Sequence, residues 1–523
     1  MKSKSNKLET FKKYLPLILL LLVIGLAVFF RFWQLWKLPP GLHPDEAANG
    51  LDIFKMFDRY DFRIIYNTNG PREALFFYLQ AIFVAFMGST TLALRMAPAL
   101  GGVAAVVVVY FLAKDWFGRR AGLLAAFIMA VNPWAVIITR DGFRASLVPL
   151  FVALTALLAG KAYKTSRIVY FVLAGAVFGL GFYSYTAFSL FSLVPAAGLI
   201  YMLLFRRLWL RANLKKLGIA LLTTLIVLTP LVVTIVRNPG DSVARAGGTS
   251  VLNSQLNGGR PLQAFASGVG KTLLQYNLFG DENPRHNVPG EPLLNTFVGI
   301  MMILGLGVCF LRFKRIAYAA TIALFFVMML PAVLTAESLP HALRSVGTEV
   351  GAFLLAAIGI NYLLQKWYKT FPVNAPARNL GLVLICGLLV LTAVQGYRAY
   401  FVAWAQDPET YSAYSENMTS IANYLNSSKG SDRKYLVADE YSAKPVEYLT
   451  HYKSSYDLLD QASLRSLPLT NGQKLFIIPA GDQSSSEIDL IKSKFPGGTI
   501  TPRYSDFSGK ALFYTYEVNY SGS

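Results

Sequence analysis

The chain has 523 residues, of which 54% are hydrophobic and only 15% are charged, and its mean hydropathy is +0.44. These values exclude a soluble multidomain protein and are typical of a polytopic membrane protein. A net charge of +20 would suggest a nucleic-acid partner in a soluble chain, but in a membrane protein the position of the charges matters more than their sum. The two cysteines, Cys309 and Cys386, lie within apolar runs, so neither a disulfide nor a cysteine-based zinc site is expected.

Apolar runs long enough to cross a hydrocarbon core of about 30 Å recur along most of the chain. The first lies near residues 14–30 and has no small-residue cleavage site before Arg31, so we interpret it as an uncleaved span and not as a signal peptide. The fold predicted is a polytopic α-helical membrane protein with about eleven transmembrane helices. The other runs lie near residues 94–113, 121–138, 145–160, 168–185, 188–205, 217–236, 293–311, 316–334, 342–364 and 380–397.

One further apolar stretch, residues 74–88, is shorter than the ~17 residues that a span normally needs. If this stretch does not cross, the segments on one side of the membrane carry the whole net charge of +20, which the positive-inside rule assigns to the cytosolic side. If it crossed, most of those basic residues would face outward. We therefore predict a multi-pass protein of the plasma (inner) membrane, with a cytosolic N-terminus and a stretch at 74–88 that lies at the interface or re-enters without crossing.

Three outer segments, residues 31–93, 237–292 and 400–523, are too long to be simple connections. The last predicts a soluble, extracytoplasmic α/β domain that follows a transmembrane domain at residues 1–399. This tail domain could bind a substrate, recognise a partner protein or cover a functional site of the transmembrane domain. In this tail, residues 407–426, 442–452 and 484–495 are helix-like and residues 434–439, 474–479 and 511–518 are strand-like.

The first polar cluster comes directly after the first span, in the segment KLPPGLHPDEAANG. Asp45 and Glu46 stand there at the beginning of a helix-like segment. Acidic residues favour this position because of the helix dipole, so a cap is the simpler interpretation. The alternative is that a carboxylate at the membrane surface, beside a lipid headgroup, serves as a general base.

The second cluster, TRDGFR, lies in an outer loop before the span near residue 145. Arg140 and Arg144 are four residues apart and would project from one face if the segment were helical. A local ion pair between Asp141 and Arg144 is one interpretation. The other is a pair of guanidinium groups that grips a phosphate.

Two more outer segments carry a similar mixture of acid, arginine and histidine. GDENPRHN holds Asp281, Arg285 and His286, although its Gly, Asn and Pro also predict an ordinary turn. LPHALR holds His341 and Arg344, which could be ordinary interfacial residues. All four clusters lie on the outer side in a topology derived without them, and together they suit a phosphate-bearing lipid and an acceptor hydroxyl.

The spacing of the four histidines does not match a chelating pattern such as His-x-x-x-His. We therefore predict no tightly held metal and no certain cofactor, and at most a loosely bound divalent cation. No Walker loop or dinucleotide fingerprint is found in the sequence, which disfavours a nucleotide-dependent enzyme.

The segments LPPGLHPDEAANG, GDENPRHN and LPHALR, with the arginine-rich loop between them, resemble a bacterial member of the glycosyltransferase-C superfamily. The chain is similar to glycosyltransferase family 39, the dolichyl-phosphate-mannose protein mannosyltransferases, and to the lipid A aminoarabinose transferases. The resemblance covers roughly residues 10–400. Its most specific part is the Asp-Glu pair in the first outer loop.

The resemblance implies an integral-membrane, inverting glycosyltransferase. Such an enzyme moves a sugar from a polyprenyl-phosphate donor to an acceptor hydroxyl of a protein, lipid or envelope glycan on the outer face. It implies that Asp45 is the general base, that Glu46 assists it or binds nearby, and that residues 74–88 form a juxtamembrane helix. The donor-phosphate ligands implied are Arg140, Arg144, Arg72, Arg344 and His341, and the substrate-loop residues are Asp141, Asp281, Arg285 and His286.

The sequence also departs from the family. Pro71-Arg72-Glu73 stands where the protein O-mannosyltransferases carry His-Pro-Pro, and no β-trefoil domain is found, so neither a protein acceptor nor mannose is assumed. An O-antigen ligase-like enzyme is an alternative that the Asp-Glu pair disfavours. A lipid transporter or flippase is another, disfavoured because the interiors of the predicted spans carry almost no charge.

Overall fold

The computed structural model describes residues 2–238, 250–428 and 433–521. It contains two compact units, and each unit draws on several stretches of the chain. The first comprises Met1–Trp33, Arg63–Phe76 and Ala97–Trp404, and the second comprises Gln34–Phe62, Phe77–Met96 and Ala405–Ser523. The second unit thus combines parts of the first outer loop with the tail, a grouping that composition does not reveal. The predicted division between residues 399 and 400 stays a prediction.

The first unit is built almost entirely of helices, most of them apolar along their length. In a hydrocarbon solvent a helix satisfies every backbone hydrogen bond within itself, which explains this choice of structure. The long helices are α1 (Lys2–Phe32), α4 (Thr91–Phe117, whose first turn belongs to the second unit), α5 (Arg119–Val131), α7 (Val148–Thr165), α8 (Ile168–Gly181), α9 (Leu193–Phe205), α10 (Arg207–Arg237), α13 (Pro261–Leu274), α14 (Thr296–Leu311), α15 (Ile316–Val327), α17 (Glu349–Thr370) and α18 (Ala375–Tyr397).

Short elements connect these helices. They are the strand pair β1 (Ile65–Tyr66) and β2 (Arg72–Glu73), the helices α6 (Pro133–Arg140), α12 (Ser254–Asn257) and α16 (Leu330–Val333), and the segments η1 (Arg144–Leu147), η2 (Thr186–Ser192), η3 (Val346–Thr348), η4 (Arg398–Ala403) and η5 (Trp404–Gln406).

The multi-pass character predicted from the sequence is confirmed. Among the described residues, eight helices are long and apolar enough to cross a membrane, or nine if the bent pair α5–α6 is one span. Two further predicted spans coincide with α8 and α14, which have only 14 and 16 residues. The prediction of about eleven spans therefore stays a prediction.

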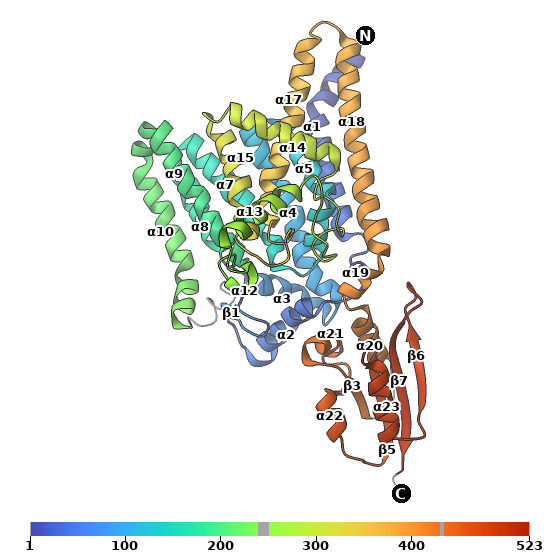
Figure 1. Cartoon of the computed structure of the whole chain (residues 1–523). Coiled ribbons are helices and arrows are strands. Elements are labelled where there is room, and N and C mark those ends of the chain that lie inside the picture. Colours follow the sequence, from blue (N-terminus) through green and yellow to red (C-terminus); the bar gives the residue numbers. More distant parts are fainter. Residues whose placement is uncertain (1, 239–249, 429–432, 522–523) are drawn as a thin grey trace. The chain divides into compact units, whose positions relative to one another are not determined.

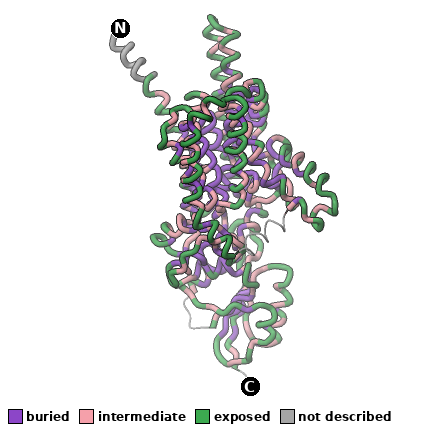
Figure 2. Tube along the Cα trace, turned by 90° about the vertical axis from the view of Figure 1, so that its left-hand side faces the viewer, coloured by how far each residue is buried: buried purple, intermediate pink, exposed green. Residues whose placement is uncertain are grey.

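Burial divides the helices of the first unit into inner and outer members. The span that contains α17 is 83% buried, whereas the span of α10 is only 11% buried. In Figure 2 the buried residues lie inside the helical bundle and the exposed ones at its margin. The exposed residues of α10 include Leu221, Leu222 and Ile226. Such apolar outer faces are what contact with lipid requires, and the span of α18, which is 22% buried, lies at one edge of the bundle (Figure 1).

A break between α5 and α6 places the arginine-rich loop. The chain bends by 60° between the two helices. Pro133 cannot donate the backbone hydrogen bond that would continue α5, and the Asn132 side chain caps α6 by accepting a hydrogen bond from the Ala135 backbone N–H. The loop that contains Asp141 and Arg144 begins where α6 ends.

The second unit contains a five-stranded mixed sheet with strand order β4-β3-β5-β7-β6 (Figure 1). Strand β3 is parallel to both β4 and β5, whereas β7 is antiparallel to β5 and β6. The strands are β3 (Arg433–Val437), β4 (Asp457–Leu459), β5 (Gly472–Pro479), β6 (Thr499–Tyr504) and β7 (Ala511–Tyr520), and the helices are α2 (Pro44–Arg59), α3 (Leu75–Met87, whose first turn belongs to the first unit), α19 (Pro408–Ala413), α20 (Glu416–Ser427), α21 (Glu440–Thr450), α22 (Gln461–Ser466) and α23 (Ser484–Lys494).

Every helix and strand predicted in the tail is present, and the sequence reading missed β4, α22 and β6. Strand β6 carries few buried side chains, and β4 has only three residues, so neither has a strong hydrophobic pattern. The sheet packs around a core that includes Phe476, Phe495 and Tyr516.

Two helices of the first outer loop belong to the second unit. Helix α3 coincides with the predicted interfacial stretch, and its 13 residues span only about 20 Å, less than the hydrocarbon core. Helix α2 packs on α21 of the tail: the Phe54 ring stacks on the His451 ring with centres 3.9 Å apart, and lies 5.3 Å from the Tyr448 ring. The first outer loop and the tail therefore pack against each other within the second unit.

Candidate functional site

Asp45 lies in the first turn of α2, the helix of the first outer loop that belongs to the second unit. The cap of this helix is His43, whose Nδ1 accepts a hydrogen bond from the Asp45 backbone N–H at 3.0 Å. The side chain of Asp45 is 38% exposed. Because the cap is supplied by His43, the Asp45 carboxylate does not serve as the cap, and the helix dipole favours its anionic form.

A tail residue orients this carboxylate. The Tyr441 hydroxyl donates a hydrogen bond of 2.9 Å to Asp45 Oδ1, and Tyr441 itself is exposed. The acid therefore remains accessible while one of its oxygens is fixed. These are the two properties that a general base needs, together with an acceptor proton within reach.

Glu46 has a different environment from its neighbour. It is 2% exposed, and its Oε2 lies 3.0 Å from Nη2 of Arg95, the first-turn arginine of α4. The Arg95 guanidinium also donates to the backbone carbonyls of Pro39 and Gly41. Glu46 is thus engaged in a buried ion pair that fixes the chain leading into α2, an arrangement that favours a supporting role over direct assistance in proton transfer.

In the first unit, residues from three of the segments predicted to lie on the outer side come together around Phe143. Its ring centre lies 5.6 Å from that of His286, and the Arg285 guanidinium lies over the same ring at 5.0 Å. The His286 ring stacks on the His341 ring, with centres 4.7 Å apart and planes inclined by 19°. The second, third and fourth clusters of the sequence therefore converge, as a common outer topology predicts.

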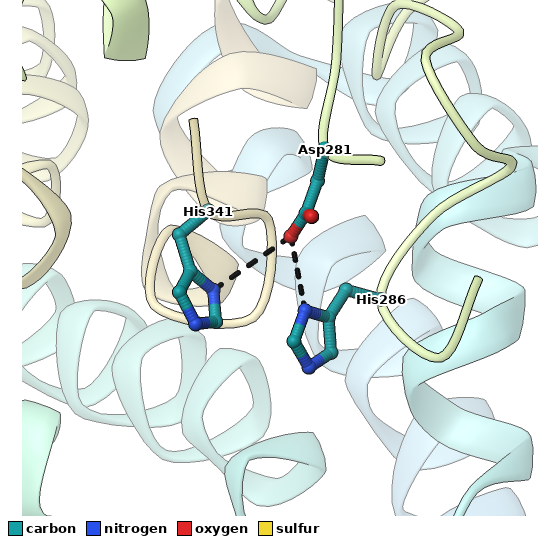
Figure 3. A group of neighbouring side chains, drawn as sticks. All are labelled: Asp281, His286 and His341. Carbon is teal, nitrogen blue, oxygen red and sulfur yellow. Dashed lines mark hydrogen bonds and ion pairs between the residues drawn. The ribbon is translucent and has the colours of Figure 1, made fainter. Parts of the chain in front are cut away.

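Asp281 is the centre of this group (Figure 3). Its Oδ2 lies 3.0 Å from Nδ1 of His286 and 3.7 Å from Nδ1 of His341, and it accepts a hydrogen bond of 2.8 Å from the Ala342 backbone N–H. All three side chains are buried. One carboxylate thus joins the GDENPRHN loop to the LPHALR segment.

The electrostatics of the group follow from its burial. Burial lowers the pKa of His341 well below its usual range, and the charges of His286 and Arg344 lower it further. Burial also lowers the pKa of His286, against the opposing effect of Asp281. For Asp281, burial opposes ionisation, but the hydrogen bond with His286 and the imidazole charges outweigh it, so its pKa lies below the ordinary value.

The same three residues could hold a metal ion. Their candidate ligand atoms, two imidazole nitrogens and a carboxylate oxygen, all lie within 4.8 Å of one another. Two histidines and one carboxylate suit Zn²⁺ or another divalent first-row metal. Such an ion would supply Lewis-acid stabilisation to a phosphate oxygen. The chelating pattern was not found in the sequence because the two histidines are far apart along the chain.

Arg144 contacts the segment that departs from the family pattern. Its Nη1 forms an ion pair with Glu73 Oε2, and Glu73 Oε1 accepts a hydrogen bond of 2.8 Å from Thr186. The structure thus gives Arg144 a partner other than the local Asp141 considered from the sequence. The pair is partly accessible, with side chains 10% and 13% exposed.

Arg140 is fully buried, and its guanidinium donates hydrogen bonds to groups inside the protein. Its Nε donates to the Tyr400 hydroxyl at 2.7 Å, its Nη1 to the Phe30 carbonyl at 2.9 Å and its Nη2 to the Trp33 carbonyl at 2.8 Å. Helix α6 ends at Arg140 and Arg144 begins η1, so the two arginines do not share a helical face. This geometry favours a structural role for Arg140 over the predicted phosphate binding.

The remaining predicted residues have mixed environments. Arg344 is paired with Glu337, whose Oε2 lies 2.9 Å from its Nη2. Arg72, in β2, is 4% exposed, and Asp141, beside α6, is fully buried. Of the predicted donor-phosphate residues, Arg344 and Arg144 are the arginines with partly exposed side chains.

Part of the chain matches a known protein family. Residues 72–233 match the sequence pattern of the family described as dolichyl-phosphate-mannose-protein mannosyltransferase. Asp45 and Glu46 lie outside the matched region. Two candidate mannosyltransferases of Bacillus subtilis, YkcB and YycA, are each 27% identical to this chain, over 225 and 221 residues. These alignments span 42% and 40% of this chain but only 30% of each relative.

Solved structures resemble a much larger part of the chain. The oligosaccharyltransferase of Archaeoglobus fulgidus, solved with a tethered acceptor peptide, covers 98% of this chain and 75% of its own at 14% identity, with a TM-score of 0.57. ArnT of Cupriavidus metallidurans, solved with undecaprenyl phosphate, covers 95% of this chain and 97% of its own at 13% identity, with a TM-score of 0.53.

The chain shares the fold of these two enzymes. The fold implied by the resemblance to the glycosyltransferase-C superfamily is therefore confirmed. The sequence reading missed the partners that fix the candidate residues, namely Arg95, Tyr441, Glu73 and Phe143. Arg95 carried a usable signal, because a charge at the end of an apolar span needs a partner.

Proposed function

We propose that this protein is an integral-membrane glycosyltransferase that transfers a sugar from a polyprenyl phosphate to an acceptor hydroxyl on the outer face of the plasma membrane. The match to a mannosyltransferase family supports the reaction class. The fold shared with ArnT, whose structure holds undecaprenyl phosphate, supports the class of donor. The sugar and the acceptor are not assigned by these likenesses.

The observation that carries the proposal is the environment of Asp45. Its carboxylate is 38% exposed, stands in the first turn of α2 and is oriented by the Tyr441 hydroxyl. The adjacent Glu46 is buried against Arg95 and is not similarly accessible. Of the two acids predicted from the sequence, we therefore assign the general base to Asp45 and a supporting role to Glu46.

The chemistry proposed is a single displacement. Asp45 takes the proton of the acceptor hydroxyl while the acceptor oxygen bonds to the anomeric carbon. The bond from that carbon to the phosphate oxygen breaks, and its electron pair leaves with polyprenyl phosphate. One displacement inverts the anomeric configuration. The leaving phosphate needs charge stabilisation more than protonation, a role that we propose for Arg144 and Arg344.

The test is polyprenyl-phosphate release by the full-length protein in lipid vesicles. Wild type and Asp45→Asn are supplied with a panel of polyprenyl-phosphate sugars and with envelope extracts as acceptors. A positioned base contributes typically 10²–10⁴-fold, so we expect Asp45→Asn to lose about that much turnover while remaining folded. Full activity in this variant would exclude Asp45 as the base.

The control is Asp460→Asn, an acid that caps the helix α22 of the tail. It removes the same charge from another helix N-terminus of the second unit, so it should keep its activity. If the wild type releases no polyprenyl phosphate with any donor but moves labelled lipid between leaflets, the transport alternative replaces the transferase.

A further inference from the structure

The second unit contains a polar pocket of about 450 Å³ that is separate from Asp45. Three parts of the chain form its walls. The segment after α1 contributes Trp36 and Lys37, the beginning of α4 contributes Thr91, and the tail contributes Asn423 of α20 and Lys453, which follows α21. A volume of this size lies within the range of small-ligand sites in proteins.

The lining has the chemistry of a site for an anionic polyol. The Trp36 side chain is 64% exposed, which offers a flat apolar face. The exposed amide of Asn423 and the hydroxyl of Thr91 can exchange hydrogen bonds with ligand hydroxyls. Lys37 and Lys453 bring two positive charges, and no acidic residue is among the described residues that line the pocket. A phosphodiester carries one negative charge and would offset part of this positive charge.

The walls of the pocket are tied to one another by hydrogen bonds. Lys453 Nζ donates to the Ser89 carbonyl at 3.0 Å, which links the tail to the turn before α4. The Thr419 hydroxyl of α20 accepts a hydrogen bond of 2.9 Å from the Leu42 backbone N–H. The Arg95 guanidinium donates a hydrogen bond of 2.7 Å to the Pro39 carbonyl. Because these contacts fix the walls to one another, binding would cost little ordering entropy.

The position of the pocket along the chain points to the membrane surface. Trp36 follows Phe32, the last residue of the first candidate span, by only four residues, and Thr91 is the first residue of the next candidate span. Tryptophan and lysine at a span end are often simple interfacial anchors. That interpretation does not account for Asn423 and Lys453, which come from the tail and face the same pocket.

We propose that this pocket binds a polyol phosphate, a phosphodiester that carries free hydroxyl groups, and that it is the acceptor subsite of the transferase. The acceptor role rests on the proposed function, whereas the binding itself does not. The same chemistry could be presented by a lipid headgroup or by a soluble glycan, and the experiment separates these sources. The tail then selects the acceptor, which is one of the three roles left open by its sequence.

The binding test uses the full-length protein and isothermal titration calorimetry. One arm titrates soluble glycerophosphoglycerol into the detergent-solubilised protein. The other compares protein in nanodiscs of phosphatidylcholine with and without phosphatidylglycerol, and measures whether the lipid abolishes the glycerophosphoglycerol signal. Saturable binding in detergent that survives the lipid supports a soluble ligand, and binding that the lipid displaces supports a headgroup. No saturable binding in either arm overturns the proposal.

The matched variants are Lys37→Gln and Lys492→Gln. Both remove one exposed lysine charge from the second unit, but Lys492 lies on α23 and does not line the pocket. We expect Lys37→Gln to weaken binding about three- to tenfold, because an exposed charge pair is screened by solvent and contributes less than a buried one, and Lys492→Gln to leave it unchanged. Equal affinities for the two variants, or inorganic phosphate binding as tightly as glycerophosphoglycerol, would contradict the proposal.

The acceptor role is tested separately from the reaction class. In the transfer assay, Lys37→Gln should raise the KM for a polyol-phosphate acceptor about three- to tenfold and leave kcat unchanged, because the residue does not touch the reacting atoms. Transfer with an unchanged acceptor KM would overturn the acceptor role alone. Lys37-dependent binding with no transfer from any donor would overturn the proposed function and leave the binding site standing.

Discussion

The carboxylate of Glu46 and the guanidinium of Arg95 form an ion pair from which water is excluded, with side chains 2% and 1% exposed. The pair connects the first turn of α2 to the first turn of α4. Arg95 also donates a hydrogen bond to the Pro39 carbonyl. The segment that leads to Asp45 is therefore fixed by a residue with no part in the proposed chemistry.

This pair predicts a large loss of stability in Glu46→Gln. The substitution leaves the Arg95 charge buried without its counter-ion, which typically costs about 3–5 kcal/mol. Thermal unfolding of the purified protein should therefore shift strongly downward. Glu517→Gln, which removes an exposed glutamate of β7, should leave unfolding nearly unchanged. A stable Glu46→Gln variant that has lost turnover would instead assign Glu46 a direct chemical role.

Arg140 and Arg144 should respond differently to the same substitution. Arg140→Gln removes a buried charge that donates to Tyr400 and to two backbone carbonyls, and hydrogen bonds from charged groups contribute about 1.5–3 kcal/mol each. We expect a marked loss of folded protein. Arg144→Gln disrupts a partly exposed pair and should remain folded, with the KM for the donor raised about tenfold as for the loss of a phosphate contact. Donor titrations with both variants measure the contrast, and an unaltered donor KM for Arg144→Gln would remove it from the phosphate ligands.

Tyr441→Phe tests whether the tail positions the candidate base. The variant removes the hydroxyl that donates to Asp45 Oδ1 and keeps the ring. Because the carboxylate would then sample more orientations, we expect kcat to fall about tenfold, the effect of one neutral hydrogen bond, with little change in the acceptor KM. Tyr504→Phe, at an exposed tyrosine of β6, is the control. A fall in melting temperature without a change in kcat would mean that the contact is only structural.

Hydropathy and charge were sufficient to predict the multi-pass fold, the short apolar segment that forms α3 and most elements of the tail, because burial in lipid and in a sheet leaves periodic signals in the sequence. They were not sufficient to pair residues that are remote along the chain. Glu46 and Arg95 lie in different segments, and so do His286 and His341, whose spacing argued against a chelating group. Distance in sequence does not limit distance in space once several outer segments meet.

The cluster of Asp281, His286 and His341 gives a prediction about metal content. We expect the protein purified without chelator to bind about one equivalent of a divalent transition metal, with Zn²⁺ favoured by the ligand set. Elemental analysis measures this directly. His341→Ala should lose the metal, and His451→Ala, a histidine of the second unit, should retain it. If the protein still contains no metal after incubation with Zn²⁺, Asp281 joins the GDENPRHN loop to the LPHALR segment through hydrogen bonds alone.

The glycine of the DEAANG sequence is explained by the packing of α2 on the tail. A Cβ at Gly50 would lie 2.2 Å from one ring carbon of Tyr448 and 2.3 Å from another, closer than any real side-chain contact. The ring cannot easily move, because its hydroxyl donates to the Thr90 carbonyl at 3.2 Å and its face lies on Phe54. Gly50→Ala is therefore an overpacking substitution and should cost about 1–3 kcal/mol.

Thermal unfolding of Gly50→Ala, read together with a compensating variant, tests this explanation. Replacing Tyr448 with Leu in the Gly50→Ala background removes the clashing ring, so the double variant should lose less stability than the two single losses added together. Gly481→Ala is the matched control, because no atom lies within 4 Å of the Cβ it would acquire. If Gly50→Ala unfolds like the wild type, or if the two substitutions are simply additive, the loop helix and the tail do not pack together as closely as this contact requires.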